Sequence, residues 1–378
     1  MIDTTILQQS FASHFGGEGT PYFTPGRINL IGEHTDYNGG FVFPGAVTQG
    51  ISAVVRPNNS PRVHLYAVDL QRSCSFDLTD LEGPTDVNFR YVYGVVRELM
   101  AAGVIVEGFD AVYGGDVPLG AGMSSSAALE SCFAFALCDL FGGHLDRMTL
   151  ARIGQATEHK YVGVKCGIMD QFASMHGRAE HLMRLDCRSG EFQYFPWHPD
   201  GYRLLLINSC VKHELVGSPY NERRASCERV AALAGVETLR DCSWEQLKTL
   251  QPQLNNEDYR RARYVLGEVD RVLAVCDALE RDNYEEVGRQ MYLTHEGLSK
   301  DYEVSCPELD FLVDEARRLG VSGARLMGGG FGGCTINLVR NELYDNFLTE
   351  VQQTYRSRFG VDCQPIPVTI GDGARHLS

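Results

Sequence analysis

The glycines of this 378-residue chain are concentrated in three short segments, and these segments limit how the chain can fold. Glycine adopts positive φ angles that other residues avoid, so a cluster of glycines marks a tight turn or a close backbone approach. The clusters are PGRINLIGEHTDYNGGFVFPGAV at 25–47, GGDVPLGAGMSSSA at 114–127 and MGGGFGGC at 327–334. The rest of the chain is therefore organised around these three places.

Strand and helix patterns alternate between the clusters. Short β-branched or apolar runs predict strands at ISAVVRP, RVHLYAV, YRLLLINS, CTINLV and PIPVTIG. Helical spacing appears in YNERRASCERVAALAG and RARYVLGEVDRVLAVCDALERD, and AALESCFAFALCDLFGG predicts a buried helix with a glycine C-cap. This alternation indicates an α/β or α+β protein. The length predicts two domains, which we divide at residues 1–180 and 181–378.

Composition narrows the classes of function. A formal charge of −15 without a Lys- or Arg-rich block argues against nucleic-acid binding. None of the twelve cysteines forms a CxxC pair, and Cys132, Cys138 and Cys276 lie in apolar helical patterns, which indicates a reducing compartment. The N-terminus does not read as a signal peptide, and no apolar run approaches the ~20 residues that span a bilayer. These features predict a cytoplasmic protein that binds no membrane.

The second cluster, GAGMSSSAALE at 120–130, joins a glycine turn to a helix start. Such a junction presents free backbone N–H groups and the positive end of the helix dipole, which together bind anions. Ser124 is predicted to cap the helix, and a following hydroxyl could reach a magnesium ion held by phosphates. A simple N-cap without a ligand is the alternative. The chain has no Gly-Lys dipeptide, so a Walker A loop is absent.

The third cluster matches the dinucleotide fingerprint GxGxxG through Gly328, Gly330 and Gly333. That fingerprint requires a helix to follow, but the next residues, CTINLV, form a strand pattern. We therefore predict a glycine loop between buried strands.

Two polar groups of residues remain. The first cluster holds five polar residues close together: Arg27, Glu33, His34, Asp36 and Asn38. Ionised hydrogen-bond acceptors at such close spacing are suited to binding the hydroxyl groups of a sugar. A solvated polar turn or a metal site are the alternatives, although neither HExxH nor an EF-hand loop fits.

The segment TEHKYVGVKCGIMDQFASMHG at 157–177 adds two acids. Glu158 lies in a helical pattern, and Asp170 lies among apolar residues, where a carboxylate either pairs with a cation or has a raised pKa. A carboxylate that caps the residues after it is the alternative.

These motifs carry a resemblance. GRINLIGEHTDYNGG resembles the galactokinase signature, GAGMSSSAALE resembles the phosphate loop of the GHMP kinase superfamily, and MGGGFGGCTI resembles its third motif. They occur in family order and spacing, with CGIMDQF between the second and third. The resemblance implies an α+β GHMP kinase fold with an N-terminal domain like domain 2 of ribosomal protein S5 and a ferredoxin-like C-terminal domain. The active site would lie between the domains, and the chain end could pack back on the first.

The resemblance also implies roles for particular residues. The activity would be transfer of the γ-phosphoryl group of ATP to the anomeric hydroxyl of α-D-galactose, with Asp170 as catalytic base and Arg27 facing it. Mg²⁺ would be held by Ser126 and Glu158. The galactose contacts would be Glu33, His34, Asp36, Gly167, Asp170 and Tyr220. The phosphate contacts would be Gly120, Ala121, Gly122, Met123, Ser124, Ser125 and Ser126.

The sequence departs from the family pattern in TPGR, where APGR is usual, and at Gly45, where a larger residue is common. We expect Gly45 to loosen the wall of the sugar pocket, which keeps an N-acetylgalactosamine kinase as an alternative. A non-catalytic sensor of galactose and ATP is a second alternative, on the principle that fold does not fix function. A monomer is the default expectation.

Overall fold

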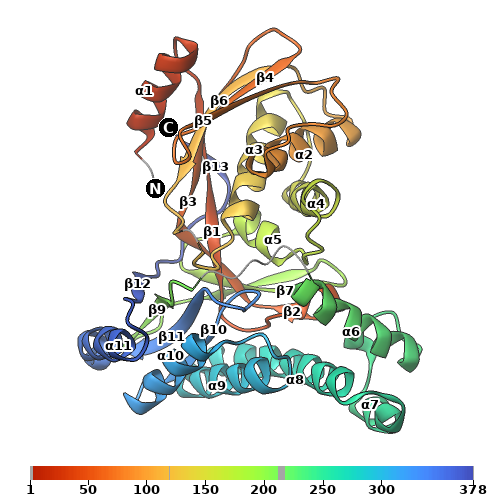
Figure 1. The fold of residues 1–378 in the computed structure, drawn as a ribbon, viewed down its shortest axis with the longest axis vertical. Helices are drawn as coiled ribbons and strands as arrows, with labels where there is room; N and C mark the ends of the chain where they lie inside the picture. The colour runs from red at the N-terminus through yellow and green to blue at the C-terminus, as the bar shows by residue number, and fades with distance from the viewer. Residues whose placement is uncertain (1–2, 119, 212–217, 378) are drawn as a thin grey trace.

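The computed structural model describes residues 3–118, 120–211 and 218–377, and it contains two main sheets, one above the other in Figure 1. The upper sheet has six strands, antiparallel except for the parallel pair β4 and β6. The last strand of the chain returns to its edge beside β1. In sheet order the strands are β13 (Arg375–His376), β1 (Thr20–Asn29), β3 (Pro44–Pro57), β6 (Phe109–Gly115), β4 (Arg62–Ala67) and β5 (Arg72–Asp77).

Helices cover both faces of this sheet. Helix α1 (Thr4–Phe15) lies on one face and buries Leu7 and Phe11 against Val54 and Val112. Four helices cover the other face around α3, whose Phe133 is fully buried. Their bounds are α2 (Val87–Ala101), α3 (Ser125–Leu140), α4 (Arg147–Thr157) and α5 (Met169–His176). Because α3 is apolar nearly all round, it forms the centre of this core, as its sequence predicts.

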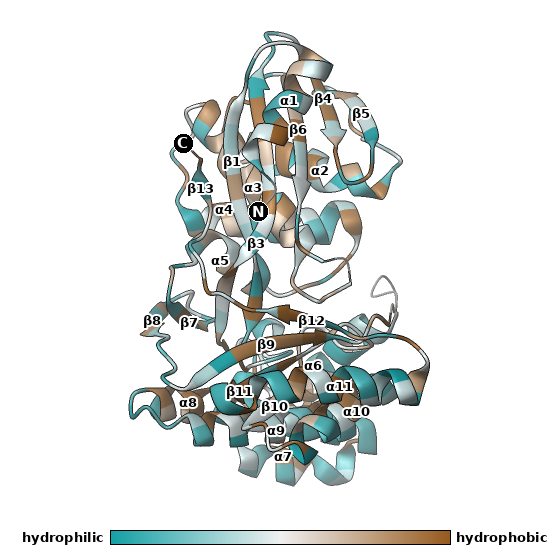
Figure 2. Cartoon of the chain, turned by 90° about the vertical axis from the view of Figure 1, so that its left-hand side faces the viewer, coloured by the Kyte–Doolittle hydropathy of each residue, from teal (hydrophilic) through white to brown (hydrophobic). Residues whose placement is uncertain are grey.

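The lower part is built on an antiparallel four-stranded sheet in the order β10 (Gly323–Leu326), β11 (Cys334–Arg340), β9 (Tyr202–Asn208) and β12 (Gln364–Pro367). Figure 2 shows a continuous hydrophobic stretch along β9, whose residues 204–207 are all buried, as expected for a strand between layers. The surrounding helices are α6 (Ser218–Ala234), α7 (Trp244–Leu250), α8 (Asn256–Leu279), α9 (Tyr284–Lys300), α10 (Pro307–Arg318) and α11 (Tyr344–Phe359).

A small sheet and five short helical turns complete the described chain. In this sheet β7 (His181–Asp186) lies between β2 (Phe41–Val42) and β8 (Phe192–Pro196), so the sheet joins the first glycine cluster to the chain just beyond α5. The turns are η1 (Asp36–Asn38), η2 (Glu158–Val162), η3 (Leu239–Asp241), η4 (Gln251–Gln253) and η5 (Asn341–Leu343). The division at residue 180 stays a prediction.

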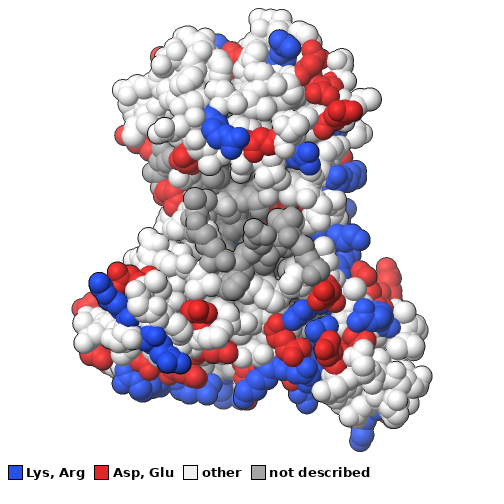
Figure 3. Space-filling model, in the orientation of Figure 1, with Lys and Arg blue, Asp and Glu red and all other residues white. Residues whose placement is uncertain are grey.

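The surface and the cysteines are those of an ordinary globular chain. Figure 3 shows lysines and arginines interspersed with aspartates and glutamates over the lower half of one face. Surface pairs such as Arg289 with Glu286, at 2.7 Å, lie on single helices. All twelve cysteines are free, and Cys132, Cys138 and Cys276 are buried, as predicted. In the part of the chain that is described, no helix combines the length and apolarity needed to cross a bilayer.

Candidate active site

A cavity of about 270 Å³ lies between the upper and lower parts of the molecule, and it collects all fifteen site residues that the sequence predicts. They reach it from β1, the loop before η1, the phosphate loop, η2, α5 and α6. The predicted residues along its wall are Arg27, Glu33, His34, Asp36, Gly120, Ala121, Gly122, Met123, Ser124, Ser125, Ser126, Glu158, Gly167, Asp170 and Tyr220. Their individual roles stay predictions.

The TPGR motif brings β1 against the phosphate loop. The register of β1 with β3 is interrupted between Pro25 and Arg27, and such a bulge turns a side chain out of the regular sheet pattern. A Cβ on Gly26 would lie 2.6 Å from the carbonyl oxygen of Met123, so only glycine permits this approach. The N–H of Arg27 then donates to the same carbonyl at 3.1 Å. The motif therefore fixes the position of Arg27 relative to the phosphate loop.

Arg27 and Asp170 form an ion pair in the cavity. Nε of Arg27 donates to Oδ1 of Asp170 at 2.7 Å, and Nη1 donates to the carbonyl of Gly122 at 2.5 Å. Burial would lower the pKa of Arg27, but the nearby carboxylates, that of Asp170 first, raise it above its usual value. The guanidinium is 3% exposed and charged, and it links Asp170 to the phosphate loop.

Ser124 differs from its predicted role. It occupies the N-cap position of α3, but its hydroxyl makes no capping hydrogen bond and instead donates to Oδ2 of Asp170 at 2.5 Å. Its backbone has a φ of 58°, the left-handed region that a serine seldom adopts. Such backbone strain is concentrated at functional sites because the surrounding structure must maintain it. The prediction of a capping hydroxyl was wrong because the hydroxyl is turned toward the Asp170 carboxyl, to which it donates, and accepts no bond from the backbone N–H groups of the first turn.

The phosphate loop alternates left-handed residues. Gly120, Gly122 and Ser124 have φ of 73°, 67° and 58°, a pattern that turns successive N–H groups toward one concave side. The third glycine cluster lies against this loop, since a Cβ on Gly122 would be 3.2 Å from the carbonyl oxygen of Met327. That cluster connects β10 to β11, as the sequence predicts. The loop and the N-terminus of α3 can together hold an anion.

Ser126 and Glu158 lie together on the phosphate side. Burial raises the pKa of Glu158 to about 7, although a hydrogen bond from the Ser126 hydroxyl lowers it. Glu158 is 6% exposed and starts η2, a π-helical turn, so the predicted helix changes form at this residue. A buried carboxylate with a hydroxyl beside it, close enough to Asp170 for that charge to raise its pKa further, is an oxygen-ligand set that suits Mg²⁺. The pair therefore fits a divalent cation shared with phosphate oxygens.

Asp36 and Gly167 lie on the side of the cavity where the sequence predicts the sugar, called the sugar side below. A Cβ on Gly167 would lie 1.8 Å from Oδ2 of Asp36, so glycine is required where the chain before α5 passes this carboxyl. Burial raises the pKa of Asp36 to about 7, and the charge of Asp170 adds to the effect. Hydrogen-bond donors such as the hydroxyl groups of a sugar stabilise the ionised form of a carboxyl of this kind.

His34 and Tyr220 stand on the same side. His34 is 4% exposed, with a φ of 62°, and its ring centroid lies 5.5 Å from that of Tyr220. Nδ1 of His34 bonds the Tyr37 hydroxyl, whereas Nε2 has no hydrogen-bond partner among the described residues. Burial lowers the pKa of His34 to about 3, so the ring is neutral.

Arg325 is the residue that sequence reasoning missed. It is 0% exposed, and its Nη1 lies 3.0 Å from Oε1 of Glu33. It also donates to the carbonyls of Asn29, Leu30 and Leu326. Oε1 of Glu33 accepts a further bond from the N–H of Gly328, at 2.8 Å. Arg325 therefore joins the first and third clusters, and its place in GARLMGGG, directly before the glycines, was the available signal.

Gly45 does not belong to the site. It lies in β3, where a Cβ would meet Leu182 at 2.4 Å and Ile370 at 3.1 Å, both in the hydrophobic core. It is not among the residues that line the cavity. The expectation of a looser sugar pocket is corrected, since this glycine accommodates core side chains.

Comparisons with known proteins agree with this arrangement. The family model of the galactokinase galactose-binding signature matches residues 9–57. The family model of the GHMP kinases N terminal domain matches residues 90–178, and that of the GHMP kinases C terminal matches residues 276–357. A galactokinase of Exiguobacterium sibiricum is 40% identical over 100% of this chain and 99% of its own. The chain belongs to the galactokinase family. A galactokinase of Bacillus subtilis is 37% identical over 98% of both chains.

Solved structures give the same result for the fold. The structure of Lactococcus lactis galactokinase complexed with galactose has a TM-score of 0.94 and 34% identity, covering 99% of this chain and 100% of that one. Methanococcus jannaschii mevalonate kinase, at 21% identity and a TM-score of 0.68, covers 94% of this chain and 99% of its own and shares the fold. The predicted α+β GHMP kinase fold is confirmed. This family member is an ATP-dependent sugar kinase.

Proposed function

We propose that the chain transfers the γ-phosphoryl group of ATP to the C1 hydroxyl of α-D-galactose, with the fifteen cavity residues in their predicted roles. The observation that carries the proposal is Asp170, which is paired with Arg27 at 2.7 Å in the same cavity as the phosphate loop. Phosphoryl transfer depends mainly on positioning and charge stabilisation, and the cavity supplies both.

Asp170 takes the proton from the sugar hydroxyl in this mechanism. Its Oδ1 and Oδ2 each accept one bond from the protein, so both oxygens keep a lone pair for the substrate. The Arg27 guanidinium pairs with this carboxylate and stabilises the negative charge on the transferring phosphoryl group. Galactose is held so that its C1 hydroxyl faces Asp170. The residues that hold it are Glu33, His34, Asp36, Gly167 and Tyr220.

The nucleotide side uses backbone groups and a cation. Residues 120–126 cradle the phosphates with N–H groups, which allows a chain of charge −15 to bind a polyanion. Ser126 and Glu158 would hold Mg²⁺, which would supply neutralisation of the phosphate charge. The protein is proposed to act in the cytoplasm.

The direct test supplies the purified chain with Mg²⁺, ATP and either galactose or N-acetylgalactosamine. We expect galactose 1-phosphate as product, a much larger kcat/KM for galactose than for the acetylated sugar, and loss of transfer when EDTA removes the cation. Equal or faster phosphorylation of the acetylated sugar would establish that alternative instead. Binding of both substrates without any product would identify a sensor.

Galactose affinity should depend on pH through Asp36. The pKa of this group is about 7 in the free protein, and sugar hydroxyls that donate to its ionised form will lower that pKa. Binding therefore releases a proton, so the dissociation constant for galactose, measured by calorimetry without nucleotide, should rise roughly tenfold from pH 8 to pH 6.

Two variants separate this effect from other titrations. Asp36→Asn should bind galactose weakly and with little pH dependence, because the amide does not titrate. Glu158→Gln is the control, since it removes the other carboxyl of pKa about 7 on the phosphate side and should leave the pH dependence intact. A flat pH profile in the unmodified enzyme would contradict the role given to Asp36.

A further inference from the structure

A row of four hydrogen-bonding side chains runs from the sugar side of the cavity into the lower part of the molecule. Nδ1 of His34 lies 2.7 Å from the hydroxyl oxygen of Tyr37, which lies 2.9 Å from the hydroxyl oxygen of Tyr302. The Tyr302 oxygen lies 3.2 Å from Sγ of Cys227. We call these four residues the His34 row. His34, Tyr302 and Cys227 are 4%, 0% and 1% exposed.

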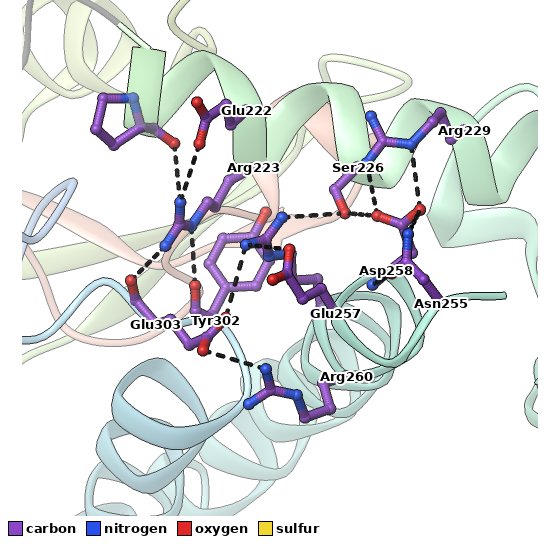
Figure 4. Close-up of polar contacts among 12 residues, drawn as sticks. Glu222, Arg223, Ser226, Arg229, Asn255, Glu257, Asp258, Arg260, Tyr302 and Glu303 are labelled. Carbon is purple, nitrogen blue, oxygen red and sulfur yellow. Dashed lines mark hydrogen bonds and ion pairs between the residues drawn. The ribbon is translucent and has the colours of Figure 1, made fainter.

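The far end of the row is fixed by α6 (Figure 4). Arg223 on that helix donates from Nε to the carbonyl of Tyr302 at 3.0 Å and from Nη2 to the carbonyl of Glu303 at 2.6 Å. The N–H of Tyr302 donates to the carbonyl of Gly297 at 2.9 Å. The backbone of Tyr302 is therefore fixed at both its N–H and its C=O group, and this limits where the phenol can lie. Tyr220 lies on the same helix, so α6 supports two parts of the sugar site.

The neutral His34 ring carries one proton, on Nδ1 or on Nε2. If Nε2 is protonated, the thiol of Cys227 donates to Tyr302, Tyr302 to Tyr37, and Tyr37 to Nδ1. If Nδ1 is protonated, every donor in the row reverses and Cys227 becomes the final acceptor. Both orders give each phenol oxygen one donated and one accepted bond.

The strength of the bond at His34 favours the first order. The thiol makes a weak bond in either order, as donor or as acceptor, so the two orders differ mainly at the imidazole. A phenol that donates to an imidazole nitrogen makes a stronger bond than an imidazole N–H that donates to a phenol oxygen. The 2.7 Å between Nδ1 and the Tyr37 oxygen is also shorter than the usual separation of about 2.9–3.0 Å in an N–H···O bond.

We propose that Tyr37 and Tyr302 are positioning residues that hold His34 in the Nε2–H form, so that His34 donates a hydrogen bond to a hydroxyl oxygen of the sugar. This inference rests on the proposed function of the cavity. It explains why Nε2 is buried without a hydrogen-bond partner among the described residues. It also makes one sugar oxygen an obligatory acceptor.

The proton position is tested by ¹⁵N NMR of histidine-labelled protein, with the His34 signals assigned from a His34→Leu variant. We expect the free enzyme to show a protonated Nε2 and an unprotonated Nδ1 at His34, and Tyr37→Phe to give a mixture of both forms. A protonated Nδ1 in the unmodified enzyme overturns the proposal.

Kinetics tests the consequence for binding. Tyr37→Phe and Tyr302→Phe should raise the KM for galactose, by about tenfold for Tyr37, with the KM for ATP unchanged. Tyr292→Phe is the matched control, because its hydroxyl donates to the carbonyl of Val321 at 2.8 Å outside the cavity. An unchanged galactose KM in Tyr37→Phe or in His34→Leu overturns the proposal, and galactose phosphorylation by the same preparations shows separately whether the proposed function stands.

Discussion

Replacing Asp170 by asparagine should lower kcat by about a thousandfold while galactose still binds. The amide keeps the shape of the carboxylate and can still accept the bond from Arg27, but it cannot take the proton of the sugar hydroxyl. General-base catalysis is worth roughly 10²–10⁴ in rate, so the loss should appear mainly in kcat. Steady-state kinetics gives kcat, and calorimetry gives the galactose affinity.

The matched control is Asp258→Asn. Asp258 pairs with Arg229 at 2.6 Å, a similar distance, but this pair joins α6 to α8 away from the cavity (Figure 4). We expect the kcat of this variant to stay within a few-fold of the unmodified enzyme. Retained turnover in Asp170→Asn would exclude Asp170 as the base, and equal losses in both variants would indicate a general effect of breaking an ion pair.

Replacing Arg325 by methionine should lower the free energy of unfolding by about 3–5 kcal/mol, the expected cost of removing one partner of a buried ion pair. The variant removes one donor from Glu33 and one from each of three backbone carbonyls, in a region where Arg325 itself is 0% exposed. The carbonyls belong to Asn29 and Leu30 in the first glycine cluster and to Leu326 just before the third. Both clusters should therefore become less stable together. Denaturant unfolding measures the free energy.

The control for this variant is Arg318→Met. Arg318 pairs with Glu315 at 2.8 Å, but its side chain is 52% exposed. Exposed pairs contribute roughly 0–1 kcal/mol, so this change should be small. A loss below about 1 kcal/mol for Arg325→Met would contradict the structural role that we assign to the buried pair.

The sequence predicted the elements well where the pattern was strong. The apolar helix after the phosphate loop is α3, and the β-branched runs are β3 and β4. The glycine loop before CTINLV connects two strands because a strand pattern, not a helix, follows it. These predictions depend on local periodicity and glycine content, which the chain itself carries.

The details of the site were less predictable. Ser124 occupies a helix start, but whether its hydroxyl caps the helix depends on Asp170, which lies 46 residues later. Gly45 seemed to face the sugar because it lies in the galactose motif, yet the alternation of side chains along β3 directs it into the core. Arg325 lies close to the third glycine cluster, but its neighbours in the sequence do not show that it pairs with Glu33, 292 residues away. Each error concerns a contact between residues distant in sequence.

The sequence by itself determined the family and predicted which residues carry the chemistry, since motifs in family order name an acid, a cation and a phosphate loop. The tertiary structure decided how they meet. The bulge at Gly26 aims Arg27, the Gly167 backbone passes Asp36, and the buried Arg325 joins the first cluster to the third. Packing is the physical reason, because hydrogen bonds and burial between distant segments fix directions that local pattern leaves free.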